Sequence, residues 1–174
     1  METTAPSDDA LELFWAEARK VAGLTRLASV IGVGATESLT PPAWSFGDSA
    51  EMADELLGQV LAGTKTATSS ARWEWEADGE SLPEPGDLAI VCDGSGEPRA
   101  LVRTVAVDVV PFDQVPAEHA AAEGEGDGSL ESWRRDHDAY FTAALARVGR
   151  AFAPDMPVVL ERFELLHPRP RRRR

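Results

Sequence analysis

The 174-residue sequence has little cysteine, little lysine and no long apolar run. Cys92 is the only cysteine, so an internal disulfide is impossible, which is typical of proteins in a reducing cytoplasm. No apolar stretch approaches the ~18 residues that a membrane-spanning helix needs. The first residues are acidic and polar, whereas a secretion signal begins basic and turns apolar. The sequence therefore predicts a cytoplasmic protein without a membrane partner.

Positive charge is also scarce, with 17 basic against 30 acidic residues and a net charge of −13. Proteins that coat duplex DNA use basic side chains to neutralise phosphates, so the composition argues against that class. A modified nucleoside or a short single-stranded RNA in a locally basic cleft stays compatible with it. The exception is the arginine-rich tail, residues 168–174. We expect a disordered, solvated tail there, with a nucleic-acid-binding arm as the alternative.

The length and the hydrophobic content of 43% fit one globular domain with a buried core. Residues 1–43 are interpreted as an N-terminal extension, in which apolar residues recur at helical spacing over residues 9–22. This amphipathic helix is expected to pack on the domain. Val30–Gly34 is either a short strand or a glycine-broken connector, and it lacks the third glycine of a dinucleotide-binding motif.

Beyond residue 43 the pattern alternates between the two classes of secondary structure. Helical spacing predicts helices over residues 49–62, 116–123 and 129–148. β-branched and aromatic residues predict extended chain over 63–75, 88–92, 100–110 and 158–165. The order of these elements indicates an α+β fold, a small β-barrel with flanking α-helices.

The stretch of residues 63–72 is the most unusual part of the chain, with five hydroxyl side chains and Lys65. Lys20 is the only other lysine, so the chain uses arginine almost wherever a plain positive charge suffices. Lysine, unlike arginine, can lose its proton when buried and act as a base. The alternative is an ordinary surface lysine at a helix end.

Several motifs point to one family. Gly63-Thr64-Lys65-Thr66-Ala67-Thr68 resembles the Gly-x-Lys-x-x-Thr motif of ASCH domains, a branch of the PUA-like superfamily. Three further stretches resemble the longer bacterial members of the family and occur in the expected order. They are Trp44–Ser49, Leu82–Asp87, and Glu123–Asp127 with Ser129-Leu130 and Trp133-Arg134. The resemblance implies an ASCH domain over residues 44–167, built on a small PUA-like β-barrel.

The family is mixed in function, and the resemblance carries that mixture over. Some members are thought to bind RNA, one longer member is described as a ribonuclease, and short bacterial members hydrolyse N4-acetylcytidine with a lysine, a threonine and a glutamate. Lys65 and Thr68 match the first two, and Glu123, four residues after His119, matches the third. The resemblance implies a metal-independent hydrolase of an N4-acylated cytidine-type nucleoside, without a cofactor.

Two features keep alternatives open. The short enzymes lack the Gly-Glu-Gly-Asp continuation after Glu123 and the long helix that follows it, which leaves the substrate in question. The alternatives are a ribonuclease on single-stranded RNA and a non-catalytic RNA- or nucleotide-binding module. From the residues alone, Thr68 could equally be a plain strand threonine and Glu123 a solvated loop carboxylate.

In an amide hydrolase Thr68 would supply the nucleophile, Lys65 the base, and Glu123 would orient Lys65 or pass on a proton. In an extended chain positions 65 and 68 face opposite sides, so this scheme demands a turn between them. The expected substrate-binding side chains surround the motifs: Thr66, Ser69, Arg72, Trp73, Arg103, Glu125, Asp127 and Ser129.

The remaining candidates have a structural interpretation beside the functional one. Trp73, Trp75 and Trp133 could stack on a base or pack in the core. His137 lies on the apolar stripe of its helix, which favours a structural role. The glycine-spaced carboxylates after residue 122 lack a full EF-hand pattern, so no metal site is predicted.

Overall fold

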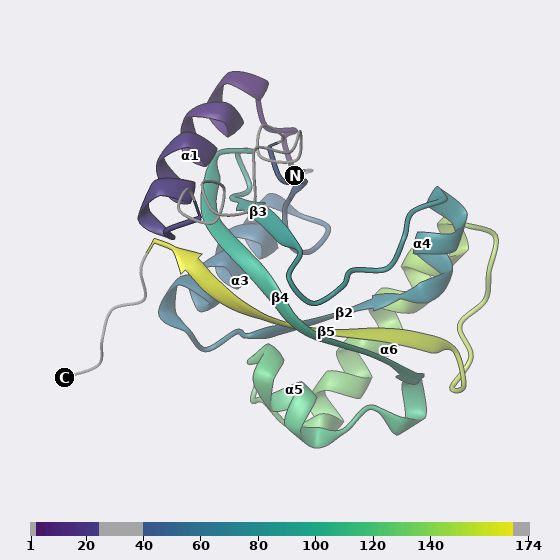
Figure 1. Cartoon of the computed structure of the whole chain (residues 1–174). Coiled ribbons are helices and arrows are strands. Elements are labelled where there is room, and N and C mark those ends of the chain that lie inside the picture. The colour runs from purple at the N-terminus through teal and green to yellow at the C-terminus, as the bar shows by residue number, and fades with distance from the viewer. Residues whose placement is uncertain (1–2, 25–39, 169–174) are drawn as a thin grey trace. The chain divides into compact units, whose positions relative to one another are not determined.

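The computed structural model describes residues 3–24 and 40–168 (Figure 1). Val30–Gly34 and the arginine tail beyond residue 168 lie outside the described residues, so their interpretations stay predictions. No helix in the described ranges is long and apolar enough to cross a membrane. Contacts divide the chain into two units. The first unit comprises residues 1–63, 88–103 and 164–174, and the second comprises 64–87 and 104–163.

Among the described residues, five strands form one mixed sheet with the hydrogen-bonded order β1-β3-β4-β5-β2. They are β1 Ala43–Trp44, β2 Ala67–Ala71, β3 Leu88–Cys92, β4 Pro98–Pro111 and β5 Pro157–His167. β1 runs parallel to β3, whereas the β3–β4 and β2–β5 pairs are antiparallel. The α+β class is confirmed. The expected closure into a barrel is wrong, because β1 and β2 stand at opposite ends of the order and do not pair.

Two helices with clear caps lie in the described part of the first unit. Helix α1 (Asp8–Val21) begins after Ser7, whose hydroxyl accepts a hydrogen bond from the Ala10 amide at 3.3 Å. Helix α3 (Ala50–Ala62) begins after Ser49 and ends at Gly63, whose φ of 77° is natural for glycine at a C-cap. The core of this unit combines residues from α1, β3 and β4: Ala18, Ile90, Cys92 and Leu101.

The second unit contains helices α4 (Arg72–Asp78), α5 (Ala117–Glu123) and α6 (Leu130–Arg147) and the short 3₁₀ turn η2 (Phe112–Gln114). Helices α5 and α6 lie beside each other (Figure 1). Aromatic and aliphatic side chains from η2, α5, α6 and β5 form the core, among them Phe112, Ala120, Trp133, Phe141 and Leu160. These contacts fix α5 and α6 against the strands that carry the candidate site.

The expected extension of the β2 strand through residue 75 is wrong, because residues 72–78 form α4. The Glu74 carboxylate accepts a hydrogen bond from the Ala71 amide at 3.4 Å, which caps the new helix. Arg72 and Glu76 form an i,i+4 ion pair with Nε and Oε1 3.0 Å apart. Trp75 Nε1 donates to Ser70 Oγ at 2.9 Å. Local capping and pairing therefore outweigh the β propensity of the tryptophans.

Candidate functional site

The site begins at the connection between α3 and β2, which is anchored at both of its ends. Gly63 ends α3, and three residues later the Thr66 amide donates to the carbonyl of Ala122, at the end of α5, at 2.8 Å. The Thr66 hydroxyl reaches the same carbonyl at 3.4 Å. This bridge holds the start of β2 against the end of α5 and places Lys65 between them.

Lys65 is fully buried, with a side chain that is 0% exposed. Its Nζ lies 2.6 Å from Oε1 of Glu125 and 3.5 Å from Oε2 of Glu123. Glu123 is buried as well, whereas the Glu125 side chain keeps 30% exposure. The ordinary-surface-lysine alternative is thereby excluded. A lysine is rarely buried unless its charge is paired, and here two carboxylates pair it.

The Glu123 carboxylate is the hub of a hydrogen-bond network. Its Oε1 accepts from Ser69 Oγ at 2.5 Å and from Trp133 Nε1 at 2.7 Å, and His119 Nε2 lies 3.2 Å away. His137 Nε2 lies 3.5 Å from Oε2. Burial alone raises the pKa of Glu123, but the hydrogen bonds from the two histidines and the charge of Lys65 outweigh it and hold the pKa well below its usual value.

The aromatic members of the network come from α6. Trp133 and His137 stack with their ring centroids 4.1 Å apart, and Phe112 also stacks on Trp133, with a centroid distance of 5.3 Å. His137 Nδ1 lies 3.0 Å from the carbonyl oxygen of Trp133. Trp133 is thus a core residue, the second of the two roles expected for it, and its indole N–H donates to Glu123.

Three of these groups have the composition of a metal site. One ligand atom each of Glu123, Glu125 and His137 can be found within 4.8 Å of the others. The same two carboxylates, however, already bind Lys65 Nζ. A divalent ion there would meet the repulsion of an ammonium at contact distance. The donor set therefore fits the lysine better than a metal.

Gly124 lets the end of α5 come this close to Lys65. It has a φ of 69°, and a Cβ built there would lie 2.6 Å from the carbonyl oxygen of Thr64. Any other residue would clash with that backbone atom. The close approach of Gly124 and the Thr66 bridge together position Glu123 and Glu125 around Lys65.

Thr68 lies on the other face of β2 from Ser69, because side chains alternate along a strand. It stands directly opposite Glu161 in the antiparallel β2–β5 pair. Glu161 Oε1 accepts a hydrogen bond from Thr104 Oγ1 of β4 at 2.5 Å. The structure thus joins Lys65, Glu123, Glu125 and Ser69 in one network and places Thr68 opposite Glu161, which Thr104 contacts from the other side. The sequence motifs point to neither Glu161 nor Thr104.

Other expected substrate-binding residues are engaged in local contacts. Arg72 pairs with Glu76, and Arg103 forms an exposed ion pair with Glu164. Asp127 Oδ1 accepts from the Ser129 amide at 2.9 Å, and Ser129 caps α6.

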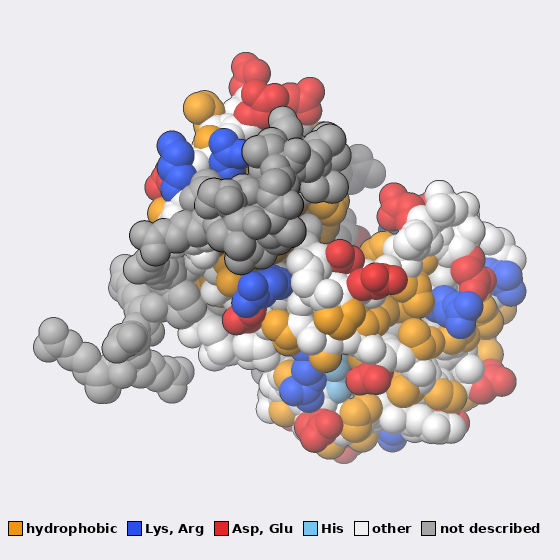
Figure 2. Space-filling view, viewed as in Figure 1, with side chains coloured by type: hydrophobic (Ala, Val, Ile, Leu, Met, Phe, Trp, Pro, Cys, Tyr) orange, Lys and Arg blue, Asp and Glu red, His pale blue; other side chains and the backbone are white. Residues whose placement is uncertain are grey.

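Trp73 packs against the core of the second unit, with the Arg150 guanidinium 4.9 Å from its ring centroid. On the face drawn in Figure 2, basic side chains of the described residues are interspersed with acidic ones. This is unlike the single-signed surface of a duplex-coating protein.

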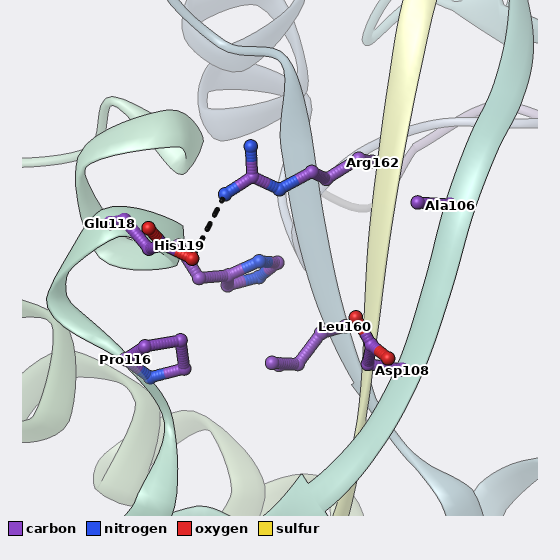
Figure 3. A pocket seen from close by; sticks show the side chains of 7 residues that line it. All are labelled: Ala106, Asp108, Pro116, Glu118, His119, Leu160 and Arg162. Carbon is purple, nitrogen blue, oxygen red and sulfur yellow. Dashed lines mark ion pairs between the residues drawn. The ribbon is translucent and has the colours of Figure 1, made fainter.

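A pocket opens beside the network, between α5 and strands β4 and β5 (Figure 3). Its walls combine apolar with charged side chains: Ala106, Asp108, Pro116, Glu118, His119, Leu160 and Arg162. The ring of His119 points into it in Figure 3, and an Arg162 nitrogen lies 3.9 Å from a Glu118 oxygen. His119 Nε2 is also 3.0 Å from Ser69 Oγ, so this histidine links the pocket to the network.

Comparison with known proteins gives one consistent result. The family model "ASCH domain" matches residues 42–167. An ASCH domain from Lactobacillus crispatus JV V101 is similar in structure, with a TM-score of 0.71, 29% identity, and coverage of 84% of this chain and 94% of that one. A protein of Enterococcus faecalis V583 has a TM-score of 0.70, 32% identity and coverage of 87% and 91%. No curated protein matches the chain.

Proposed function

The chain belongs to the ASCH domain family, and on that premise we propose that it is a metal-independent hydrolase that removes the acyl group from an N4-acylated cytidine-type nucleoside. Lys65, Thr68 and Glu123 carry the reaction in this proposal. The observation that carries it is the buried Lys65, held between Glu123 and Glu125. Burying an ion pair costs desolvation free energy, and buried ionisable groups cluster at functional sites.

Lys65 contributes positive charge rather than proton acceptance. In its two ion pairs it is an ammonium whose hydrogens point at carboxylates, so it has no free lone pair. Amide hydrolysis passes through an intermediate whose oxygen carries negative charge. In this proposal the Lys65 ammonium, three residues before Thr68 in the chain, supplies the positive charge that stabilises that intermediate.

Glu123 acts through Lys65. Its oxygens accept hydrogen bonds from Ser69 and Trp133 and face the ammonium, so the carboxylate stays ionised and fixed. A carboxylate with so many donors is a weak base, and its role is to orient Lys65. Thr68 is the nucleophile, because its hydroxyl makes no hydrogen bond in the described part of the chain and remains available for attack.

The test is conversion of N4-acetylcytidine to cytidine by the purified protein in the presence of a chelator. Lys65→Met removes the ammonium and should lower the rate by about 10²- to 10³-fold, the usual loss when one group that stabilises the oxyanion is removed. Lys20→Met is the matched control, because Lys20 is the other lysine and lies exposed on α1. Its rate should equal that of the wild type.

Urea unfolding of both variants separates loss of the reaction from loss of the fold. A wild type that releases no cytidine, or a folded Lys65→Met variant with full activity, overturns the proposal. Labelled single-stranded RNA is the parallel substrate. Cleavage of the RNA without release of cytidine would assign the site to a ribonuclease, and binding of RNA without either reaction would assign it to a binding module.

A further inference from the structure

Glu161 is the carboxyl group with unused hydrogen-bonding capacity next to Thr68. The two residues are direct cross-strand partners in the β2–β5 pair, and such partners have Cβ atoms about 4.5–5.5 Å apart. Because both side chains occupy the same face, the carboxylate and the hydroxyl can meet. Thr104 binds only Oε1 of Glu161. Neither Oε2 of Glu161 nor the Thr68 hydroxyl has a hydrogen-bond partner within the described residues.

The contrast with the opposite face of β2 is what makes this pair informative. There Ser69 is bound to Glu123 and to His119, and the Glu123 carboxylate is surrounded by donors. Fully satisfied buried networks hold a fold together. On the Thr68 face, a half-buried carboxyl oxygen and a hydroxyl without hydrogen-bond partners are instead available to bind a substrate.

We propose that Glu161 is the general base and acid of the reaction at Thr68, so that the reacting centre is the Thr68–Glu161 pair. This inference rests on the proposed function for its choice of substrate. It assigns the proton transfer that neither the ammonium of Lys65 nor the occupied carboxylate of Glu123 can carry.

The proton transfers balance with no further reactant than water. Thr68 Oγ1 bonds to the acyl carbon while its hydrogen passes to Glu161 Oε2. The bond between that carbon and N4 then breaks, Glu161 returns the proton to N4, and cytidine leaves while Thr68 carries the acyl ester. Water attacks the ester carbon and gives a proton to Glu161, which restores the Thr68 hydroxyl as the carboxylic acid departs.

The surroundings of Glu161 suit a base. Burial raises its pKa, the hydrogen bond from Thr104 lowers it, and the charge of Asp87 raises it, with a net shift upward. Asp87 is held near by its carbonyl, which accepts from the Thr104 amide at 2.9 Å. Asp87 is the charged group that acts on Glu161. The neighbours of Glu161 on β2 and β4, Thr68 and Thr104, are uncharged. A carboxylate with a raised pKa takes up a proton more readily than an ordinary one.

The experiment is the pH dependence of kcat/KM for N4-acetylcytidine. The wild-type rate should rise with pH through one acidic limb, as Glu161 loses its proton. Glu161→Gln should lower the rate by about 10²- to 10⁴-fold and abolish the limb. Glu97→Gln is the control, because Glu97 is exposed in the β3–β4 hairpin and its side chain forms no hydrogen bond or ion pair with the described residues.

Two neighbours give a readout that a merely structural Glu161 would not. Thr104→Val removes the hydrogen bond that lowers the pKa of Glu161, so the acidic limb should move to higher pH. Asp87→Asn removes the charge that raises it, so the limb should move to lower pH. Shifts in these opposite directions support Glu161 as the titrating base.

The outcomes separate this inference from the proposed function. An active wild type with a fully active Glu161→Gln variant, or with a limb that ignores both neighbours, overturns the role of Glu161 and leaves the hydrolase in place. An active wild type that loses activity through Lys65→Met but not through Glu161→Gln has the same meaning. A wild type without any conversion removes the proposed function and this inference together.

Discussion

Replacement of Glu123 by glutamine measures how far the fold depends on one buried carboxylate. Glutamine keeps an acceptor oxygen for Ser69 and Trp133, but its amide nitrogen then faces Lys65 Nζ, which loses one of two ion pairs. Breaking a buried ion pair costs about 3–5 kcal/mol. Because Glu125 remains 2.6 Å from Lys65, we expect about 3 kcal/mol, the lower end of that range.

The assay is urea unfolding followed by tryptophan fluorescence at neutral pH. With a typical dependence of about 2 kcal/mol per molar urea, Glu123→Gln should lower the unfolding midpoint by about 1.5 M. Glu125→Gln is the graded control. Its side chain is 30% exposed, so solvent screens its ion pair and the loss of stability should stay below about 1 kcal/mol.

The difference between the wild type and Glu123→Gln should also depend on pH. The pKa of folded Glu123 lies well below the ordinary value of 4.5. Its contribution to stability is therefore complete above that ordinary value and is lost as the pH falls toward the folded pKa. The two midpoints should converge in acid. A difference of less than about 0.3 M urea between the wild-type and Glu123→Gln midpoints at neutral pH would refute the reasoning. A difference that does not narrow in acid would refute it as well.

Three further results are expected. Gly124→Ala should lower the free energy of unfolding by about 3 kcal/mol in a urea titration, because the new Cβ lies 2.6 Å from the Thr64 carbonyl oxygen and the φ is left-handed. Gly63→Ala, with a similar φ and open space around it, should cost only the ~1 kcal/mol of a left-handed residue. Trp133→Phe should cost about 1–3 kcal/mol through the lost donor to Glu123, which thermal unfolding would detect. Cys92 should react slowly with a thiol reagent in the native protein, because burial raises its pKa to about 11; fast labelling would contradict this.

The elements with strong local signals could be predicted from the sequence. The helix expected over residues 49–62 is α3, and the helix expected over 129–148 is α6, because serine caps and regular apolar spacing determine both. The α4 error has a local cause too. Alternation of tryptophan and glutamate resembles a strand, yet the Arg72–Glu76 pair and Gly79 at the C-cap are helix signals. Closure of the sheet depends on pairing between distant strands, which no local pattern encodes.

The sequence predicts those site residues that follow one another in a motif. It does not predict the residues that only the pairing register of two strands brings together. The spacing of His119 and Glu123 marks one turn of α5, and both side chains reach the same network. The motif points to Thr68 but not to Glu161, its cross-strand neighbour. Glu161 is one of several polar residues that alternate along β5, and only the β2–β5 register shows that it stands opposite Thr68.

The central claim is that the Thr68 hydroxyl attacks the acyl group, and rapid acid quench after mixing with N4-acetylcytidine tests it most directly. Trypsin cuts after Lys65 and after Arg72, so a single peptide, residues 66–72, contains the hydroxyl groups of β2. Mass spectrometry should find an acetyl group on this peptide, and fragmentation should place it on Thr68. Release of cytidine with the acetyl group on Ser69 or Ser70, or with no acetylated peptide, would contradict the account.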